Sequence, residues 1–431
     1  MKKIAIASFA ALVMGFGAIT FAVPGNAATR SSGIAGQIMV KFRDNGAAAG
    51  VLRQHGLSQG AGIGSTGAHL IKVPAGKESQ LIEALSRNPA VEYAEPDELV
   101  TAATADQYFD RQYALHNVGQ SFTNTSGTLT VAGGIVDADV DAVEAWSITK
   151  GSGIRVAVLD TGVASGHDIP SDPVPSDNRD LESKVVARAN FSTAATGKDN
   201  YGHGTHVAGI VAATADNTIG VAGVCPECTI LDGKVLNDSG SGSTSAIANG
   251  INWAVNNGAK VINMSLGQSF PSRTLETAVN NAWKAGVVIV AAAGNGGTQA
   301  KFYPGAYRNV IAVAATDNRD AKASFSSYGA QWVDVAAPGV NVFSTFPNHP
   351  FVLDRTNDTN PLNDRSQGYD IASGTSMASP IVAAVAALAW SSHPGTTNAL
   401  VRDAVELTAD NIGGTDTYWE HGRVNAYNAV R

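Results

Sequence analysis

Three side chains in this sequence could together perform nucleophilic chemistry. Asp160 begins the motif Asp-Thr-Gly, His203 lies in Gly-His-Gly-Thr-His, and Ser376 lies in Gly-Thr-Ser-Met-Ala-Ser-Pro. A histidine can accept the proton of a serine hydroxyl near neutral pH, and a carboxylate on its other ring nitrogen fixes the tautomer. The three motifs therefore indicate a serine activated as a nucleophile.

The surroundings of these residues suit that chemistry. Asp160 follows an apolar stretch, so we expect it at the exit of a strand beside a tight turn. Glycines flank His203 before a predicted helix and leave its imidazole free to reach neighbouring loops. Ser376 precedes a long apolar segment in which Pro380 is compatible only with a helix start. The free N–H groups at that start favour an oxyanion formed beside the serine.

Other interpretations of the same motifs use different chemistry. Asp160 and Asp238 each begin an Asp-Thr/Ser-Gly motif, which could supply the carboxylate pair of an aspartic peptidase. Bilobal enzymes of that kind are built of strands, whereas a helical pattern at 206–215 lies between the two motifs. His203 and His206 could bind zinc, but the glutamate of His-Glu-x-x-His and a third ligand are missing. A lone serine before a helix is usually only a cap, so the combination of motifs carries the argument.

The elements that must position these residues alternate between two types. Buried apolar segments of strand length lie at 154–159, 260–266, 287–293 and 310–315, and helical periodicity is found at 206–215, 244–257, 275–285 and 379–392. This alternation predicts repeated βαβ units in a doubly wound parallel α/β sheet. Catalytic side chains then belong at the carboxyl ends of the strands.

With Asp160, His203 and Ser376 in this order and in these motifs, the chain resembles the subtilase family over about residues 105–431. The likeness is to its thermitase-like and bacterial subtilisin-like members. It implies a serine endopeptidase in which Ser376 attacks the peptide carbonyl, His203 transfers the proton and Asp160 orients His203. The family's Ala-Gly-Asn motif matches the residues that end at Asn295, which implies an oxyanion donor there. Without the other motifs, Asn295 would be a turn residue before two glycines.

The resemblance also implies how a peptide would bind. The substrate would lie extended along exposed backbone, with affinity from main-chain hydrogen bonds. The matching rim is Ser265, Leu266 and Gly267, and the matching wall of the S1 pocket is Ala292, Ala293 and Gly294. No charged residue is placed to demand a charged side chain, so broad, apolar-leaning specificity follows. Phe302 aligns with the pocket floor, where it either shortens the pocket or turns outward.

A structural calcium ion is implied by the same resemblance. The matching loop follows the His203 helix, and its carbonyl and amide oxygens suit a hard cation. The implied ligands are Gln112, Asp168, Thr214, Asn217, Ile219 and Val221. The loop is slightly longer than in well-known relatives, and an ordinary surface turn is the alternative.

Cys225 and Cys228 are the only cysteines and form the motif Cys-Pro-Glu-Cys. In an oxidising compartment they could form a local disulfide, although so short a ring closes little chain entropy. A zinc site would need more ligands. A thioredoxin-like role lacks its structural context.

The first residues indicate export and processing. Lys2 and Lys3 precede an uncharged run at 4–23 and a small-residue exit, which predicts a signal peptide at 1–28 rather than an uncleaved anchor. Residues 29–103 are expected to form an inhibitory propeptide, and residues 104–431 the catalytic domain. The polar stretch 101–106 is an exposed linker where a protease would cut.

The predicted propeptide has the pattern of a small α+β unit. Strands are expected at 37–42, 68–73 and 91–100, with helices at 47–55 and 79–87. A further strand near 60–66 would complete a ferredoxin-like βαββαβ order. The segment weakly resembles the family's inhibitor-like propeptide. This resemblance implies that the propeptide binds the catalytic domain of its own chain as an inhibitor.

Composition excludes several other classes. With 29 Lys and Arg against 37 Asp and Glu, the net charge of −8 gives no basic surface for nucleic acid. We expect a secreted, extracellular, monomeric protein that acts on proteins or peptides and leaves the membrane after signal cleavage. A nucleotide-binding α/β protein is disfavoured because no Gly-x-Gly-x-x-Gly follows the first core strand at 154–159. A subtilase-shaped binding protein without turnover is the remaining alternative.

Overall fold

A computed structural model of the chain describes residues 33–98, 105–165, 178–354 and 365–431. The chain divides into two compact units, Met1–Leu99 and Val100–Arg431, which are described separately below. The predicted signal peptide at 1–28 lies outside the described residues.

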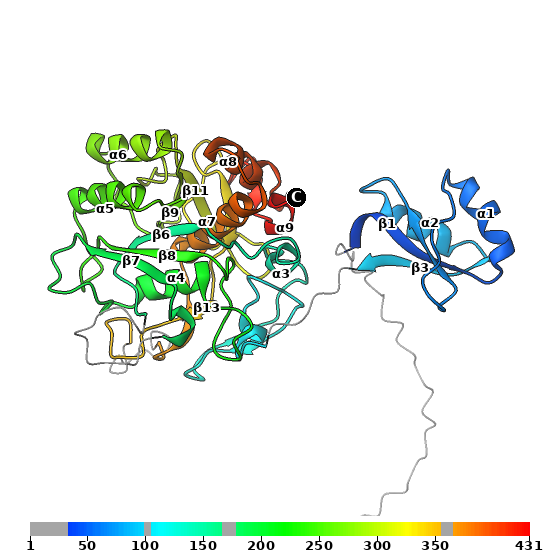
Figure 1. The fold of residues 1–431 in the computed structure, drawn as a ribbon, viewed down its shortest axis with the longest axis horizontal. Helices are drawn as coiled ribbons and strands as arrows, with labels where there is room; N and C mark the ends of the chain where they lie inside the picture. Colours follow the sequence, from blue (N-terminus) through cyan, green and yellow to red (C-terminus); the bar gives the residue numbers. More distant parts are fainter. Residues whose placement is uncertain (1–32, 99–104, 166–177, 355–364) are drawn as a thin grey trace, which may run out of the picture. The chain divides into compact units, whose positions relative to one another are not determined.

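The first unit is a small antiparallel sheet with two helices (Figure 1). Its elements are β1 (Gly33–Phe42), α1 (Asn45–Gln54), β2 (Ala68–Lys72), α2 (Glu78–Ser86) and β3 (Val91–Glu98), and the strand order is β2-β1-β3. Alternate residues of β1, Ile38 and Val40, are fully buried with Leu52 of α1 and Leu85 of α2. The predicted three strands and two helices are thus found within a few residues of their expected bounds.

The prediction of a further strand near 60–66 is wrong. In the described part of this unit, that segment makes only an isolated antiparallel bridge, between Gly62 and His69. Gly64 and Gly67 have φ of +50° and +75°, values that break an extended strand. Gly60 lies so close to Leu70 that a Cβ would approach its carbonyl oxygen to 1.7 Å. The glycines therefore form a tight turn leading into β2.

The second unit is built on an eight-stranded parallel sheet of order β15-β12-β11-β10-β9-β6-β8-β7. The strands are β6 (Arg155–Asp160), β7 (Val185–Asn190), β8 (Thr229–Lys234), β9 (Val261–Met264), β10 (Val288–Ala292), β11 (Ile311–Thr316), β12 (Val335–Pro338) and β15 (Gly422–Arg423). The helices are α3 (Ala142–Ala145), α4 (His203–Ala212), α5 (Thr244–Asn256), α6 (Arg273–Lys284), α7 (Thr375–Ser392), α8 (Asn398–Leu407) and α9 (Ala426–Ala429). The predicted α/β fold with a parallel sheet is confirmed.

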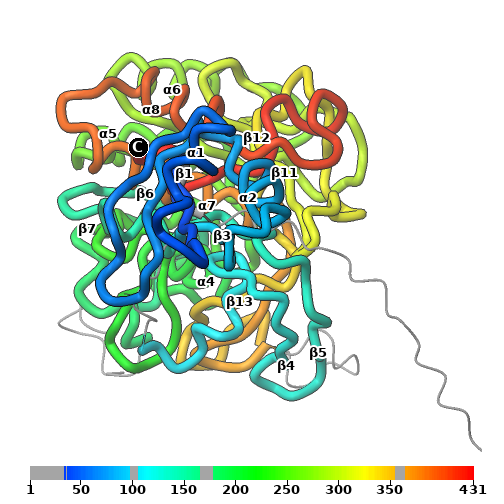
Figure 2. Tube along the Cα trace, turned by 90° about the vertical axis from the view of Figure 1, so that its right-hand side faces the viewer, coloured from blue at the N-terminus to red at the C-terminus, as the bar shows by residue number. Residues whose placement is uncertain are grey.

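Short elements complete this unit. They are the 3-10 turns η1 (Phe109–Arg111) and η2 (Arg179–Leu181), the pair β13 (Val342–Thr345) and β14 (Tyr369–Ala372), and the pair β4 (Phe122–Thr123) and β5 (Thr130–Val131). The narrow hairpin of β4 and β5 can be followed in Figure 2.

The sheet is apolar on both faces because helices cover each of them (Figure 1). Val156 and Val158 of β6 belong to a core cluster that includes residues of α4 and α7. Ala157 and Leu159, which point the opposite way, belong to a second cluster with residues of α5 and α6. This explains the continuous apolar run before Asp160.

The strand order reverses at β6. After β6 the chain goes outward to β7, returns to β8, and then crosses to β9 on the other side of β6. In open α/β sheets the crevice for ligands lies outside the carboxyl ends of the strands at such a point. Asp160, the last residue of β6, lies there.

Helix α7 is long and apolar enough to span a membrane by composition, with a mean hydropathy of 1.3 over 18 residues. In this structure 83% of it is buried inside the protein, and residues of the helix run through the first core cluster of the sheet. It packs as the central helix of a protein core.

Candidate active site

Asp160 and His203 meet at the carboxyl end of β6. His203 Nδ1 lies 2.7 Å from Asp160 Oδ1, and the carboxylate is almost completely buried. Helix α4 begins at His203, three residues earlier than the periodicity predicts, because Gly202 adopts φ +99° and turns the chain into the helix. Burial lowers the pKa of His203, but the charge and hydrogen bond of Asp160 outweigh this, so the net shift is upward.

Ser376 lies in the first turn of α7, close to the end of β9. Its Oγ donates to the Ser265 carbonyl at 3.2 Å, and Ser265 Oγ donates to the Ser376 carbonyl at 2.7 Å. Ser376, His203 and Asn295 all line one pocket of about 320 Å³. The structure therefore brings the three motifs to the same cleft.

Asn295 follows β10 and is fixed by the residue before the serine. Its Oδ1 accepts hydrogen bonds from the backbone N–H and the Oγ1 of Thr375, at 2.9 and 3.0 Å. The amide nitrogen is the group left to face the cleft. This is the arrangement expected of a donor to a developing oxyanion.

The predicted substrate segments are the two loops beside this site. Ser265, Leu266 and Gly267 follow β9 and line a second pocket of about 370 Å³, which His203 also lines. Ala292 is the last residue of β10, Ala293 and Gly294 follow it, and all three are buried. A Cβ on Gly267 or on Gly294 would approach the Phe302 ring to 2.3 or 3.0 Å. Phe302 therefore lies between the two segments instead of turning outward.

The loop after α4 gathers oxygen atoms from distant parts of the chain. Asp180 Oδ1 accepts from Asn217 Nδ2 at 2.7 Å, and its Oδ2 accepts from the Val221 N–H at 2.8 Å. Asp106 accepts from the backbone N–H groups of Asp216 and Asn217, both at 2.9 Å. Burial raises the pKa of Asp180 to about 6, and the charge of Asp106 adds to the shift.

Both carboxylates are buried, and Asp106, Asp180 and Asn217 offer side-chain oxygen atoms of the kind that a calcium ion prefers. Sequence reasoning did not find Asp106 and Asp180, because neither lies in the loop. Thr214 Oγ1 donates to the Asp180 carbonyl, and the Ile219 N–H donates to Asn217 Oδ1.

Two of the predicted calcium ligands, Gln112 and Asp168, come from outside this loop. Gln112 is buried beneath the loop, where both ends of its side-chain amide bond the backbone of Ala222, at 2.7 and 2.8 Å. Asp168 lies outside the described residues.

Asp137, Asp139 and Asp141 form a separate acidic cluster, with ligand atoms within 4.8 Å of one another. Burial raises the pKa of Asp139 to about 7, while the charge of Arg423 acts in the opposite direction. Arg423 itself forms ion pairs with Asp320 and Asp410, both at 2.7 Å, and Asn425 Nδ2 donates to both Asp410 and Asp141. The sequence analysis missed this cluster, although the Asp-x-Asp-x-Asp spacing at 137–141 is a visible signal for it.

The two cysteines are joined by a disulfide and are fully buried beside Gly151. His206, the other residue of the alternative zinc pair, is also fully buried, and its ring packs on Phe346 at a centroid distance of 4.8 Å. Burial lowers the pKa of His206 to about 3. Among the described residues, no cluster suited to a metal includes a histidine.

Comparison with known proteins gives consistent matches. Residues 151–425 match the model of the subtilase family, and residues 22–97 match that of the fervidolysin N-terminal prodomain. The chain is 46% identical over 293 residues to thermitase from Thermoactinomyces vulgaris, covering 68% of this chain and 94% of that protein. It is 43% identical over 357 residues to the thermophilic serine proteinase of Bacillus sp. (strain AK1), covering 82% of this chain and 76% of that protein.

A solved structure of a protease from Pseudoalteromonas arctica PAMC 21717 is also similar. Its TM-score is 0.62 at 29% sequence identity, and the match covers 76% of this chain and 99% of that one.

Proposed function

The chain belongs to the subtilase family of serine endopeptidases, and we propose that Asp160, His203 and Ser376 are its catalytic triad. It is a subtilisin-like serine protease with an N-terminal prodomain. The observation that carries the proposal is the 2.7 Å contact between His203 and Asp160 in a cleft that Ser376 also lines.

The proposed reaction follows from these positions. Ser376 Oγ attacks the scissile carbonyl while His203 accepts its proton and then returns it to the leaving amine. Asp160 keeps the Nδ1–H tautomer, so that Nε2 is the basic nitrogen, and stabilises the imidazolium that forms. Water then releases the acyl-enzyme through the same base.

Charge that develops on the carbonyl oxygen is stabilised by Asn295 Nδ2 and the Ser376 N–H. Both are supported by fixed structure: Thr375 holds the amide of Asn295, and the Ser376 N–H lies in the first turn of α7. Donors held in this way need no reorganisation as the oxyanion forms.

The substrate is proposed to be an extended peptide bound along Ser265–Gly267, with its P1 side chain beside Ala292–Gly294. The walls carry no ionisable side chain, which favours apolar P1 residues. Phe302 limits the depth available to them, because its ring lies against Gly267 of the rim and Gly294 of the wall.

A calcium ion is proposed to be held by Asp106, Asp180 and Asn217, with carbonyl groups of the 214–221 loop. When bound, the ion supplies a structural cross-link between the start of this unit, η2 and the loop after α4. None of the catalytic steps passes through it.

The precursor is proposed to be exported and processed. A signal peptide at 1–28 would be removed, and the propeptide at 29–103 would inhibit the enzyme until cleavage near 101–106. The prodomain match at 22–97 supports the second step. The mature protease would act as an extracellular monomer.

Casein hydrolysis by the purified protein and by its Ser376→Ala variant tests the function. We expect only the wild type to cleave casein and to lose residues 1–103, as read by terminal sequencing. A fluorophosphonate probe should label the wild type at Ser376. If both proteins are folded, inert and unlabelled, the enzyme proposal fails and a binding role replaces it.

A further inference from the structure

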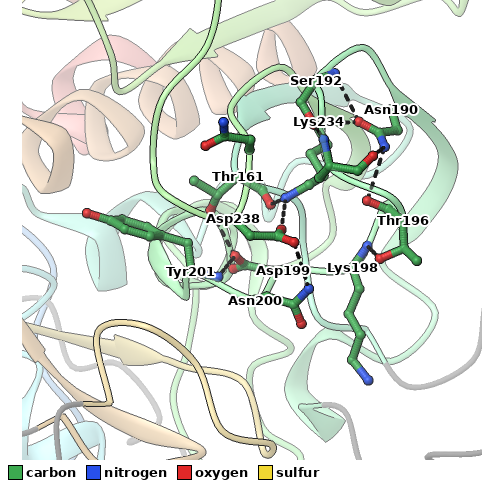
Figure 3. A network of polar contacts seen from close by, with 12 residues as sticks. Thr161, Asn190, Ser192, Thr196, Lys198, Asp199, Asn200, Tyr201, Lys234 and Asp238 are labelled. Atoms are coloured by element: carbon green, nitrogen blue, oxygen red, sulfur yellow. Dashed lines mark hydrogen bonds and ion pairs between the residues drawn. The ribbon is translucent and has the colours of Figure 1, made fainter.

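Lys234 is a lysine without solvent exposure in a network of polar contacts that includes Thr161 and Asp238 (Figure 3). It ends β8, where it is paired in register with Asp160 of β6. Its Nζ donates to the Thr161 carbonyl and forms an ion pair with Asp238 Oδ1 at 2.9 Å. Because a buried ammonium is costly unless its partners are well placed, these two contacts must be held accurately.

Thr161 connects that ammonium to the catalytic pair. Its N–H donates to Asp160 Oδ1 at 2.7 Å, the same oxygen that contacts His203. Its Oγ1 accepts from the Gly204 N–H at 2.9 Å, at the residue directly after His203. The position of Thr161 therefore sets how Asp160 and His203 face each other.

Asp199 supports the same arrangement from the other side. Its fully buried carboxylate accepts from Thr161 Oγ1 at 2.9 Å and from the Gly202 N–H at 2.8 Å (Figure 3). Lys234 and Asp199 thus hold opposite ends of one threonine, its carbonyl and its hydroxyl.

Asp238 connects Lys234 to the surface that a peptide would touch. It lies in the loop 237–242, and its Oδ2 accepts from Asn200 Nδ2 at 3.1 Å. Gly240, Ser241 and Gly242 of this loop line the same pocket as Thr161 and His203. Gly240 also packs against the Tyr201 ring, to which a Cβ would approach within 2.7 Å. The loop, Asn200 and Lys234 therefore form one connected unit.

We propose that Lys234 is a positioning residue which, through Asp238, transmits peptide binding along the 237–242 loop to the Asp160–His203 pair. The proposal rests on the proposed function. Substrate residues remote from the scissile bond would bind the 237–242 loop and fix its position. Lys234 would then hold the Thr161 carbonyl in place and keep His203 aligned. Binding energy used in this way raises kcat and not only affinity.

The test compares two ester substrates with the same P1 residue, one acetylated single residue and one tetrapeptide, with active sites counted by a fluorophosphonate. In the wild type, we expect extension to raise kcat and lower KM. In Asp238→Asn, the tetrapeptide ester should still have a lower KM than the single-residue ester. The increase in kcat between the two esters should be smaller than in the wild type by on the order of tenfold. Lys234→Met should lower kcat on both substrates, because the Thr161 carbonyl loses its donor.

Asp334→Asn is the matched control, because it also removes the carboxylate of an ion pair, here with Arg402 at 2.9 Å. Asp334 directly precedes the amino end of β12 and lies away from the cleft. It should leave the kcat gain unchanged. The inference is overturned if Asp238→Asn keeps the full kcat gain, or if Asp334→Asn loses it equally.

The Asp238→Asn result decides the matter even if Lys234→Met does not fold. Failure of the proposed function is recognised separately, because then the wild type itself would be inert and unlabelled at Ser376.

Discussion

The side-chain oxygen of Asn295 accepts two hydrogen bonds from Thr375, one from its backbone N–H at 2.9 Å and one from its Oγ1 at 3.0 Å. A backbone N–H can only donate, so the orientation of the amide is fixed by the hydrogen-bond network. The Nδ2 group lies near Gly374, where a Cβ would be 3.4 Å away. Thr375, the residue before the proposed nucleophile, thus orients the proposed oxyanion donor.

Replacing that donor should slow the reaction without weakening substrate binding. We expect Asn295→Leu to lower kcat by about a hundredfold to a thousandfold with little change in KM, a range that comes from measurements on a subtilisin. Thr375→Ser, which keeps both donors to Asn295, is the control. Steady-state kinetics on a peptide substrate measure both, and a loss confined to KM would contradict the proposed role.

Activity should depend on the protonation of His203. Only the neutral imidazole accepts the serine proton, so kcat/KM should fall as the pH drops through a pKa that lies above the ordinary value for histidine. Because Asp160 causes the upward shift, Asp160→Asn should move this acid limb to lower pH while lowering kcat by about ten-thousandfold. The pH profile of kcat/KM measures this. An unmoved acid limb in the variant would show that another group controls it.

The sequence predicted those parts of the site that lie in local motifs at strand and helix ends. Asp160 and His203 could be assigned because an apolar strand and a glycine-flanked helix start are visible in the residues themselves. Asp106 and Asp180 could not, because they reach the 214–221 loop only through the fold. β7 and β8 were also not predicted, since β7 is partly exposed and β8 contains Asp232 and Lys234, which interrupt the apolar pattern. Asp232 pairs with Arg188 of β7 and Lys234 donates to the Thr161 carbonyl after β6, which are tertiary partners that no local pattern reveals.

Removing calcium should destabilise the mature enzyme. A ligand that binds only the folded state at a hundred times its Kd adds about 2.7 kcal/mol. We therefore expect EDTA to lower the Tm of the wild type by several degrees and Asp180→Asn to abolish most of that difference. Asp110→Asn, at an exposed residue of η1, should respond to EDTA as the wild type does. Differential scanning calorimetry with and without calcium measures the effect, and an EDTA-insensitive wild type would rule the site out.

The close packing of Gly151 on the disulfide should make this glycine hard to replace. A Cβ there would lie 1.9 Å from Cys225 Sγ, and its φ of +88° disfavours other residues. Gly153 has a similar φ of +79° but open space around it. We expect Gly153→Ala to cost about 1–2 kcal/mol from the backbone alone, and Gly151→Ala about 1–3 kcal/mol more from overpacking. Denaturant unfolding of both variants measures the difference, and equal values would show that the disulfide yields to the added methyl group.

Phe302 should limit the size of the P1 residue. Its ring lies between Gly267 and Gly294, so it occupies space that a large P1 side chain would need. Phe302→Gly should therefore raise kcat/KM for a P1 phenylalanine by about tenfold to a hundredfold relative to a P1 alanine, as expected when steric exclusion in an apolar pocket is relieved. Phe302→Tyr keeps the ring and should leave the ratio unchanged. A series of tetrapeptide substrates that differ only at P1 gives this ratio, and an equal gain for both P1 residues would show that Phe302 does not set the pocket depth.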